Sequence, residues 1–290
     1  MTINKRQKGF TLVELAVVLV IVGLLLGGML KGKQLIANAR VTATVSQMSA
    51  IETAVATFSS VYGDTVGTNG KLPGDIKDAN LRIRNCGNCT TIPTSGAGAN
   101  GDGKVGDINW GGQVLQSSVG VGFPPTDIQN ETLLFWAELN NADLLSGLSY
   151  NGDGLSGSAV EFGIHMPAAK VGGGFAVSYA NGAIRPIISP FNTPSYGTFL
   201  LGNVLLLNST PTGNLSSTAG TGALNPTTAK QIDTKLDDGA PMMGRVQAFG
   251  YVTGADTAGC FADFGAPPAT PMNYNETLSG MDCGIAFQMK

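Results

Sequence analysis

The first sixty residues carry two hydrophobic patterns, one after the other. From Phe10 to Leu30 the chain is apolar almost without interruption, and the one charged residue in this run is Glu14. The 21 residues of the run, at about 1.5 Å rise per residue, make a helix of about 31 Å, which matches the hydrocarbon core of a bilayer. The pattern therefore predicts a membrane-spanning helix over 10–30.

Beyond residue 40, apolar residues recur at steps of three and four, which places them on one face of a helix. This stripe consists of Val41, Val45, Met48, Ile51, Val55, Phe58 and Tyr62, and the residues that lie off it include Arg40, Thr44, Gln47 and Glu52. No proline occurs before Pro73. We therefore expect one helix over 10–60, with its stripe covered by the C-terminal chain.

The remaining chain predicts a loop-rich head of mixed helices and strands. Residues 61–130 are rich in Gly, Asn, Asp and Pro, so they predict a long loop with short ordered pieces. Periodic segments predict helices over 131–145 and 226–239, and apolar segments predict strands over 159–166, 174–179, 183–188 and 198–207. Asn181-Gly182 predicts a type I′ hairpin turn. The expected fold class is α+β, with a long N-terminal helix packed on an antiparallel sheet.

Composition and charge favour an exported domain over a nucleic-acid-binding one. Only 13% of the residues are charged, and 41 are glycine. Residues 1–60 hold six of the 17 basic and two of the 20 acidic residues, which leaves 11 basic and 18 acidic residues in the head. A net charge of −7 there disfavours non-specific binding of nucleic acid, which needs basic patches.

The residues before the apolar run decide between three kinds of N-terminus. Lys5, Arg6 and Lys8 would hold the leader in the cytoplasm. A cleaved secretory signal fits poorly, because its apolar region is about 7–15 residues long and its small residue follows that region, whereas Gly9 precedes the run. A plain membrane anchor fits the length, but it does not explain Glu14, since an acid inside a span costs about 2.5–3.5 kcal/mol.

The sequence GFTLVEL, from Gly9 to Leu15, followed by an unbroken apolar helix, closely resembles the class III leader of type IV pilins and pseudopilins. The resemblance implies that a prepilin peptidase cuts between Gly9 and Phe10 and methylates the new amine of Phe10. Glu14 would then neutralise the Phe10 amine of a neighbouring subunit, since a buried charge pair is tolerated where a lone charge is not. The resemblance implies a structural subunit of a type IV pilus-like or type II secretion pseudopilus filament.

The same resemblance implies the domain organisation, the location and the partners. Residues 1–9 would be the leader, 10–60 the long helix and 61–290 a periplasmic or extracellular head. The chain would start as a single-pass protein of the bacterial inner membrane, with its N-terminus cytoplasmic before cleavage, and then join a periplasmic or cell-surface filament. Its partners would be copies of itself or sibling pilins, the prepilin peptidase, and an inner-membrane assembly platform with its ATPase.

The head carries a second resemblance, spread over four pieces of sequence. These pieces are LPGD (72–75), NGDGKVGD (100–107), ETLLFWAELNNADLLSG (131–147) and IDTKLDDGAPMMGRVQA (232–248). Together they resemble a group of large bacterial prepilin-type proteins, which strengthens the pilin-like interpretation without adding a task for the filament.

Four cysteines fit an oxidising compartment. The resemblance to pilins implies a disulfide between Cys260 and Cys283. Three interpretations compete for Cys86 and Cys89, which form a CxxC motif: a small disulfide loop, half of a metal site, or a redox centre. We reject zinc, because a zinc site normally needs a second ligand pair, and because the only histidine, His165, lies in an apolar run that predicts a structural role.

The segment NGDGKVGD is a partial match to a calcium-binding loop, in which alternate oxygens face one ion and glycine allows the sharp turn. The ligands of a Ca²⁺ ion would be Asn100, Asp102, the Lys104 carbonyl and Asp107. Gly98 stands where the first acid should be, and Asn109 stands in place of the final Glu. A plain glycine-rich turn is the competing interpretation.

Enzyme motifs are absent from the sequence. There is no G-x-S-x-G elbow, no Walker loop and no histidine cluster. We therefore expect no catalytic residues and no cofactor apart from calcium. The alternative function from a different class is a membrane-tethered adhesin or ligand-binding module that uses a pilin-type leader.

Overall fold

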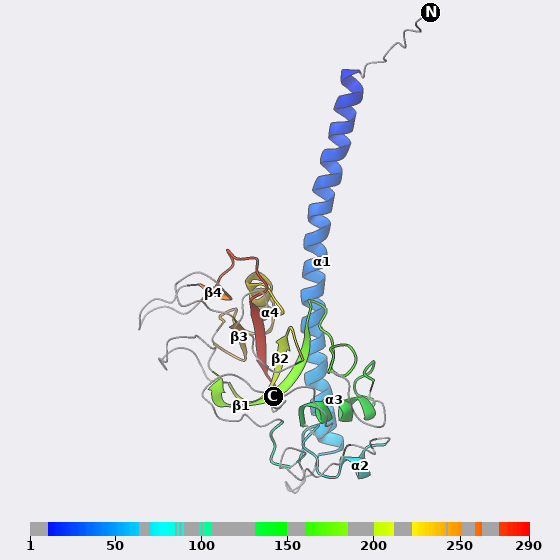
Figure 1. The fold of residues 1–290 in the computed structure, drawn as a ribbon, viewed down its shortest axis with the longest axis vertical. Helices are drawn as coiled ribbons and strands as arrows, with labels where there is room; N and C mark the ends of the chain where they lie inside the picture. Colours follow the sequence, from blue (N-terminus) through cyan, green and yellow to red (C-terminus); the bar gives the residue numbers. More distant parts are fainter. Residues whose placement is uncertain are drawn as a thin grey trace, which may run out of the picture. The chain divides into compact units, whose positions relative to one another are not determined.

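The computed structural model describes thirteen segments of the chain (Figure 1): 11–63, 70–84, 86, 89, 99, 101–105, 131–149, 160–184, 200–211, 222–241, 243–250, 259–262 and 273–290. The chain divides into two compact units, Met1–Arg40 and Val41–Lys290. Helix α1 (Leu12–Val61) contributes residues to each unit.

In the first unit, α1 is a regular helix with a bare apolar surface. The large apolar side chains from Leu12 to Leu30 are between 44% and 87% exposed. By length and composition, α1 is the one helix in the described part of the chain that could cross a membrane. The long apolar helix predicted from the sequence is confirmed.

In the second unit, the remaining part of α1 enters the hydrophobic core. Most of the predicted stripe is buried there, including Val41, Met48 and Phe58, whereas Val45 and Tyr62 are partly buried. Thr44 was expected off the stripe, but it is fully buried and its hydroxyl accepts a hydrogen bond from the Val171 amide at 3.2 Å. A threonine can therefore lie on the buried face, because a backbone donor satisfies its hydroxyl.

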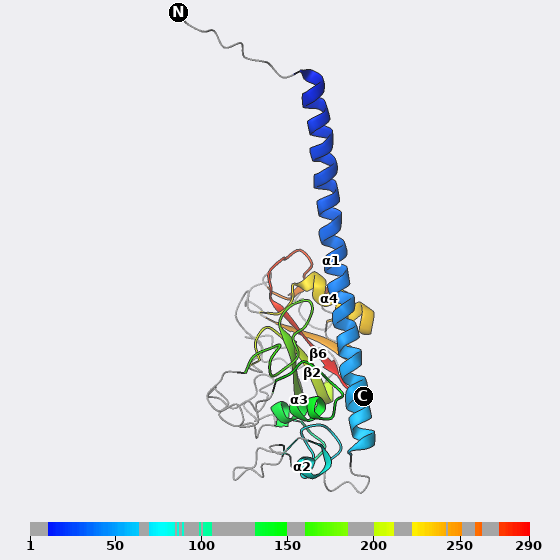
Figure 2. The same ribbon diagram turned by 90° about the vertical axis from the view of Figure 1, so that its right-hand side faces the viewer.

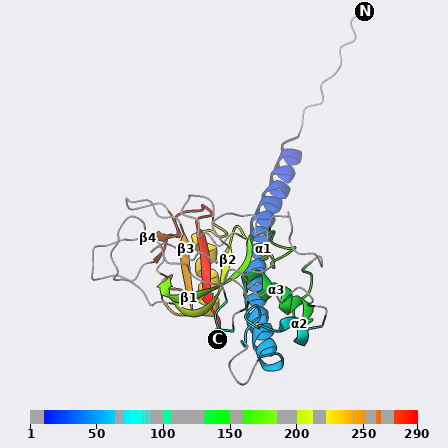
Figure 3. The same ribbon diagram turned by 60° about the horizontal axis from the view of Figure 1, so that its bottom comes forward.

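The head is built on one antiparallel sheet with the order β1-β2-β6-β3, and Figure 3 shows β6 between β2 and β3. The strands are β1 (Gly174–Ile184), β2 (Leu200–Asn208), β3 (Val246–Gly250) and β6 (Cys283–Gln288). A separate pair joins β4 (Phe261–Ala262) to β5 (Asn273–Tyr274). The α+β class with an antiparallel sheet is confirmed.

Polar contacts bind the end of the chain to α1 within the head. The Glu52 carboxylate accepts hydrogen bonds from Arg245 Nη2 at 2.7 Å and from the Lys290 amide at 3.0 Å. Figure 2 shows the last residue beside the lower part of α1. Arg245 also donates to the Gln288 carbonyl and lies over the Phe287 ring. These contacts tie β3 and β6 to the same turn of the helix.

Three short helices complete the described head: α2 (Ala79–Arg82), α3 (Glu131–Asn141) and α4 (Pro226–Leu236). Helix α4 begins as the sequence predicts, because the Asn225 side chain accepts from the Thr228 amide at 2.8 Å and proline occupies the first turn. Helix α3 ends at Asn141, four residues before the predicted end. Asp143 adopts a left-handed φ of 57°, which stops the helix.

Two predictions for the strands were wrong. Within 159–166, the described residues form a turn in which the amides of His165 and Met166 bond to the Glu161 carbonyl. At Asn181-Gly182 there is no hairpin turn, because β1 continues through both residues and Asn181 pairs with Leu201. The predicted strand 183–188 contributes only the end of β1, and residues 185–188 lie outside the described residues.

Candidate functional site

The candidate assembly site lies at the start of α1. Glu14 Oε2 accepts hydrogen bonds from the amide and from the hydroxyl of Thr11, each at 2.9 Å. In return, the Glu14 amide donates to the Thr11 hydroxyl at 3.2 Å. This reciprocal pair is a capping box, and it places the carboxylate at the positive end of the helix dipole. Glu14 therefore has partners in its own chain.

Sequence reasoning missed the part played by Thr11. Its signal was present, because a threonine three residues before a glutamate at the start of an apolar helix is the pattern of a capping box. The predicted cleavage residues, Gly9 and Phe10, lie outside the described residues.

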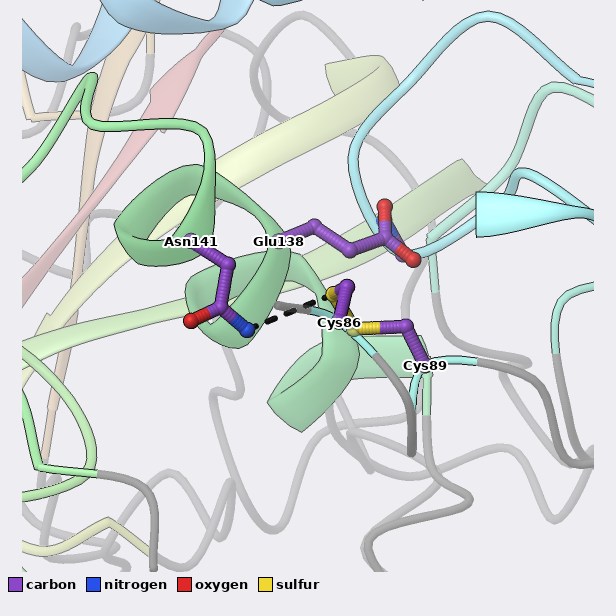
Figure 4. Close-up of a disulfide and its surroundings, with 5 residues drawn as sticks. Cys86, Cys89, Glu138 and Asn141 are labelled. Carbon is purple, nitrogen blue, oxygen red and sulfur yellow. Dashed lines mark hydrogen bonds between the residues drawn. A yellow bond between two sulfur atoms is a disulfide. The ribbon is translucent and has the colours of Figure 1, made fainter. Parts of the chain in front are cut away.

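The structure contains two disulfides, so none of the four cysteines is free. Cys260 and Cys283 are fully buried, and their bond links the residue before β4 to the first residue of β6. Cys86 and Cys89 are also buried, and they lie beside α3, where Asn141 Nδ2 donates to Cys86 Sγ at 3.3 Å (Figure 4). The pairing leaves no thiolate for a metal at this point.

Two fully buried carboxylates come from α3 and from the 70–84 segment. Glu138, on α3, accepts a hydrogen bond from the Gly74 amide at 2.6 Å through Oε2. Asp75, the next residue after Gly74, accepts from the Gly103 amide at 3.0 Å through Oδ2. The structure thus brings together three of the four pieces of the second resemblance, which are far apart in sequence.

Burial dominates the electrostatics of this pair. It raises the pKa of Asp75 to about 6, although the Gly103 amide opposes the shift, and the charge of Asp102 adds to it. Burial also raises the pKa of Glu138, against the Gly74 amide, with further contributions from Asp75 and Glu131. The charge of Asp75 therefore disfavours the charged form of Glu138.

Gly74 allows the close approach of its loop to α3. It has a φ of 81°, and a Cβ at this position would lie 2.3 Å from the Glu131 carbonyl oxygen and 2.8 Å from the Phe135 amide nitrogen. Only glycine fits both the conformation and the space. The glycine of LPGD is thus required for the Glu138 hydrogen bond.

The predicted calcium ligands are only partly within the described residues, since Asn100 and Asp107 lie outside them. Asp102 Oδ1 accepts from the Lys104 amide at 2.9 Å, and Oδ2 lies 4.0 Å from Lys104 Nζ. These contacts close a turn inside the loop. Calcium binding by the four loop ligands stays a prediction.

A second acidic group lies at the end of α4. Carboxylate oxygens of Asp233, Asp237 and Asp238 are within 4.8 Å of one another. Each carboxylate has donors from its own chain: Asp233 accepts from the Tyr274 hydroxyl, Asp237 from the Arg245 and Val246 amides, and Asp238 from the Ala240 amide. The group therefore caps the helix and the following turn.

His165 lies in the turn over 161–166, not in a strand. Its Nδ1 accepts from the Glu161 amide at 3.1 Å, and the side chain is half-buried. Burial lowers its pKa, against the opposing charge of Glu161. The accepting nitrogen requires a neutral ring, which suits a structural role in the turn.

Comparison with known proteins identifies the N-terminus. Residues 4–30 match the family model described as the prokaryotic N-terminal methylation motif. No curated protein and no solved structure matched the chain. The matched segment covers Gly9, Phe10 and Glu14. The chain carries the leader of type IV pilins and pseudopilins, and this leader marks it as a substrate of prepilin peptidase.

Proposed function

We propose that this protein is a structural subunit of a type IV pilus-like or type II secretion pseudopilus filament, and that it assembles through α1. The observation that carries the proposal is the coincidence of the methylation motif at 4–30 with a helix whose apolar side chains are bare from Leu12 to Leu30. A surface of this kind is stable in lipid or against other apolar helices, and a filament core supplies the second environment.

Assembly exchanges one environment of Glu14 for another. Cleavage after Gly9 leaves a positive amine on Phe10. The Glu14 carboxylate, which is held by Thr11 in the isolated chain, faces the amine of a neighbouring Phe10 in the filament core. The capping box keeps the acid at the helix end and limits the desolvation of an unpaired charge before assembly.

The proposal gives the chain a place and partners. Before assembly, the chain is a single-pass protein of the inner membrane. Prepilin peptidase removes residues 1–9, and an assembly platform with its ATPase then adds the chain to a periplasmic or surface filament of like subunits. The leader suggests a structural protein, not an enzyme.

Two substitutions of Glu14 test the mechanism. Glu14→Ala removes both the cap and the charge, whereas Glu14→Gln keeps an acceptor for the Thr11 amide and removes only the charge. We expect both variants to insert into the membrane. The amount of each variant in a sheared filament fraction should be at least tenfold lower than that of the parent. Glu276→Ala, which removes a surface acid paired with Lys230, should assemble normally.

The intact mass of the chain from the sheared fraction completes the test. A chain that begins at methylated Phe10 supports processing and polymerisation together. If Glu14→Gln assembles like the parent, helix capping and not charge pairing explains Glu14. If both variants keep full surface activity without a filament, the protein is a membrane-tethered adhesin or ligand-binding module.

A further inference from the structure

Each of the buried acids Asp75 and Glu138 has one carboxylate oxygen that accepts no hydrogen bond from the described residues. Asp75 Oδ2 and Glu138 Oε2 are fixed by the amides of Gly103 and Gly74. Asp75 Oδ1 and Glu138 Oε1 are also shielded from solvent, and neither has a hydrogen-bond partner among the described residues. A buried carboxylate oxygen without a partner is costly and rare in native proteins, so it requires an explanation.

We propose that Asp75 Oδ1 and Glu138 Oε1 bind a divalent cation of the calcium type inside the head. The two residues belong to segments that the Gly74–Glu138 hydrogen bond holds together. Both side chains are fully buried, so the site is an internal one that joins the 70–84 segment to α3.

The charge around the site favours a cation. None of the ion pairs formed by described residues includes Asp75 or Glu138. The side-chain charges that raise the pKa values of the pair come from acids, since Asp102 raises the pKa of Asp75 and Glu131 raises that of Glu138. Two carboxylates that repel each other in a buried site are stabilised together when a doubly positive ion lies between them.

The donor atoms select a hard ion. Carboxylate oxygens suit Ca²⁺ and Mg²⁺, whereas the neighbouring sulfur atoms of Cys86 and Cys89 are held in a disulfide and offer no thiolate (Figure 4). Mg²⁺ demands near-ideal octahedral geometry and keeps several waters, which a fully buried site does not favour. Ca²⁺ accepts irregular sets of oxygens, including carbonyls, such as loop segments supply.

This site differs from the loop site predicted from the sequence. Its ligands are Asp75 and Glu138, while the Gly101–Val105 segment serves as a support that orients Asp75 through the Gly103 amide. Asp102, engaged with Lys104, is not a ligand. The two sites therefore respond differently to substitution.

Calcium titration of the full processed chain in detergent, after removal of metal by a chelator, tests the proposal. We expect saturable binding by calorimetry and a rise in Tm of roughly 5–10 °C at saturating CaCl₂. Asp75→Asn and Glu138→Gln should each weaken binding at least tenfold. Asp102→Asn and the exposed Asp143→Asn should bind like the parent.

A second measurement does not depend on whether the variants fold. Tb³⁺ bound at the site should luminesce through Trp136, two residues from Glu138 on α3, and CaCl₂ should displace it. Absence of both binding heat and Tb³⁺ luminescence in the parent chain would overturn the proposal. Loss of calcium binding in Asp102→Asn with normal binding in Glu138→Gln would also overturn it. A third contrary outcome is a parent chain whose Tm does not respond to calcium and that Glu138→Gln stabilises, because this result would mean that the two acids share a proton. None of these readouts involves filament assembly, so the failure of one proposal leaves the other intact.

Discussion

The two parts of α1 differ in what surrounds them, although they belong to one helix. From Leu12 to Leu30 the large apolar side chains are at least 44% exposed, whereas Val41, Met48, Ile51, Val55 and Phe58 are at most 3% exposed. The first part has an apolar surface on all sides, and the second has a stripe. An apolar surface on all sides suits a helix surrounded by lipid or by other helices, while a stripe suits one side of a globular core.

The two parts of α1 are therefore stabilised by different contacts. Burial of the stripe contributes to the stability of the head, since apolar area removed from water stabilises by about 25 cal/mol per Å². The first part gains nothing comparable in the isolated chain, so under the proposed function its stabilising contacts come from a membrane or from neighbouring subunits. Substitutions in the two parts should therefore act on different measurements.

The largest expected contrast is between Phe58→Ala and Leu19→Ala. Phe58 is fully buried and its ring lies 5.0 Å from that of Tyr62, whereas Leu19 is 64% exposed. Phe58→Ala should lower the free energy of unfolding of the head by about 3–5 kcal/mol, because it leaves a cavity. Leu19→Ala should leave the near-UV circular dichroism melt of the head unchanged. Equal shifts of Tm would contradict the separation.

Titration gives an intermediate effect that belongs to the head alone. Burial raises the pKa of Asp233 from its ordinary 3.8 to about 7, with the charges of Asp238 and Asp237 adding and the Tyr274 hydroxyl opposing. The protonated form is thus favoured by folding, so its stabilising contribution is complete below about pH 4 and is lost as the pH rises through about 7. Between pH 5 and pH 8 we expect Tm to fall by roughly 2–5 °C.

Asp233→Asn provides the control for that measurement. It keeps the shape and cannot ionise, so the part of the fall due to Asp233 should vanish, while Asp143→Asn should retain it. A pH profile identical in parent and Asp233→Asn would refute the assignment.

The smallest expected change in Tm is for substitutions of the glycines in the exposed first part of α1. A Cβ at Gly27 or Gly28 would meet no atom of the described residues within 4 Å, whereas one at Gly284 on β6 would lie 2.3 Å from the Phe249 ring. Gly27→Ala should therefore change the Tm of the head by less than about 1 °C, and it should favour the helix by up to about 1 kcal/mol. Gly284→Ala should lower Tm clearly. A filament defect in Gly27→Ala would locate a close helix–helix approach at that residue.

The long helix, α4 and β2 could be predicted because their signals are local. Periodicity fixed the stripe of α1, and Asn225 and Pro226 marked the start of α4. The predicted turn at Asn181-Gly182 was wrong because the pairing of β1 with β2 outweighs the local turn preference. The prediction that Thr44 lies off the buried stripe was wrong for a similar reason, since its burial depends on a hydrogen bond from the Val171 amide, which is distant in sequence.

The carboxylate pair was beyond sequence reasoning. Acids are expected at the surface, and nothing local links Asp75 to Glu138. Only the fold shows that a glycine at 74 lets one segment reach the other. The leader lies at the opposite extreme, because Gly9, Phe10 and Glu14 lie within one short motif, residues 4–30, that can be recognised from the sequence alone.

The position of β6 in the sheet determines when the head can form. Strand β6 pairs with β2 on one side and with β3 on the other, and it carries Cys283 of the Cys260–Cys283 disulfide. Synthesis proceeds from the N-terminus, so α1 is complete long before residues 283–288 exist. Until then, β2 and β3 each lack a neighbour, and unpaired strand edges are prone to aggregation. A cell that makes this protein must therefore protect a half-finished sheet until the chain is complete, and truncation before β6 would leave only the β1–β2 pair of this sheet and would remove the Cys260–Cys283 disulfide in the same step.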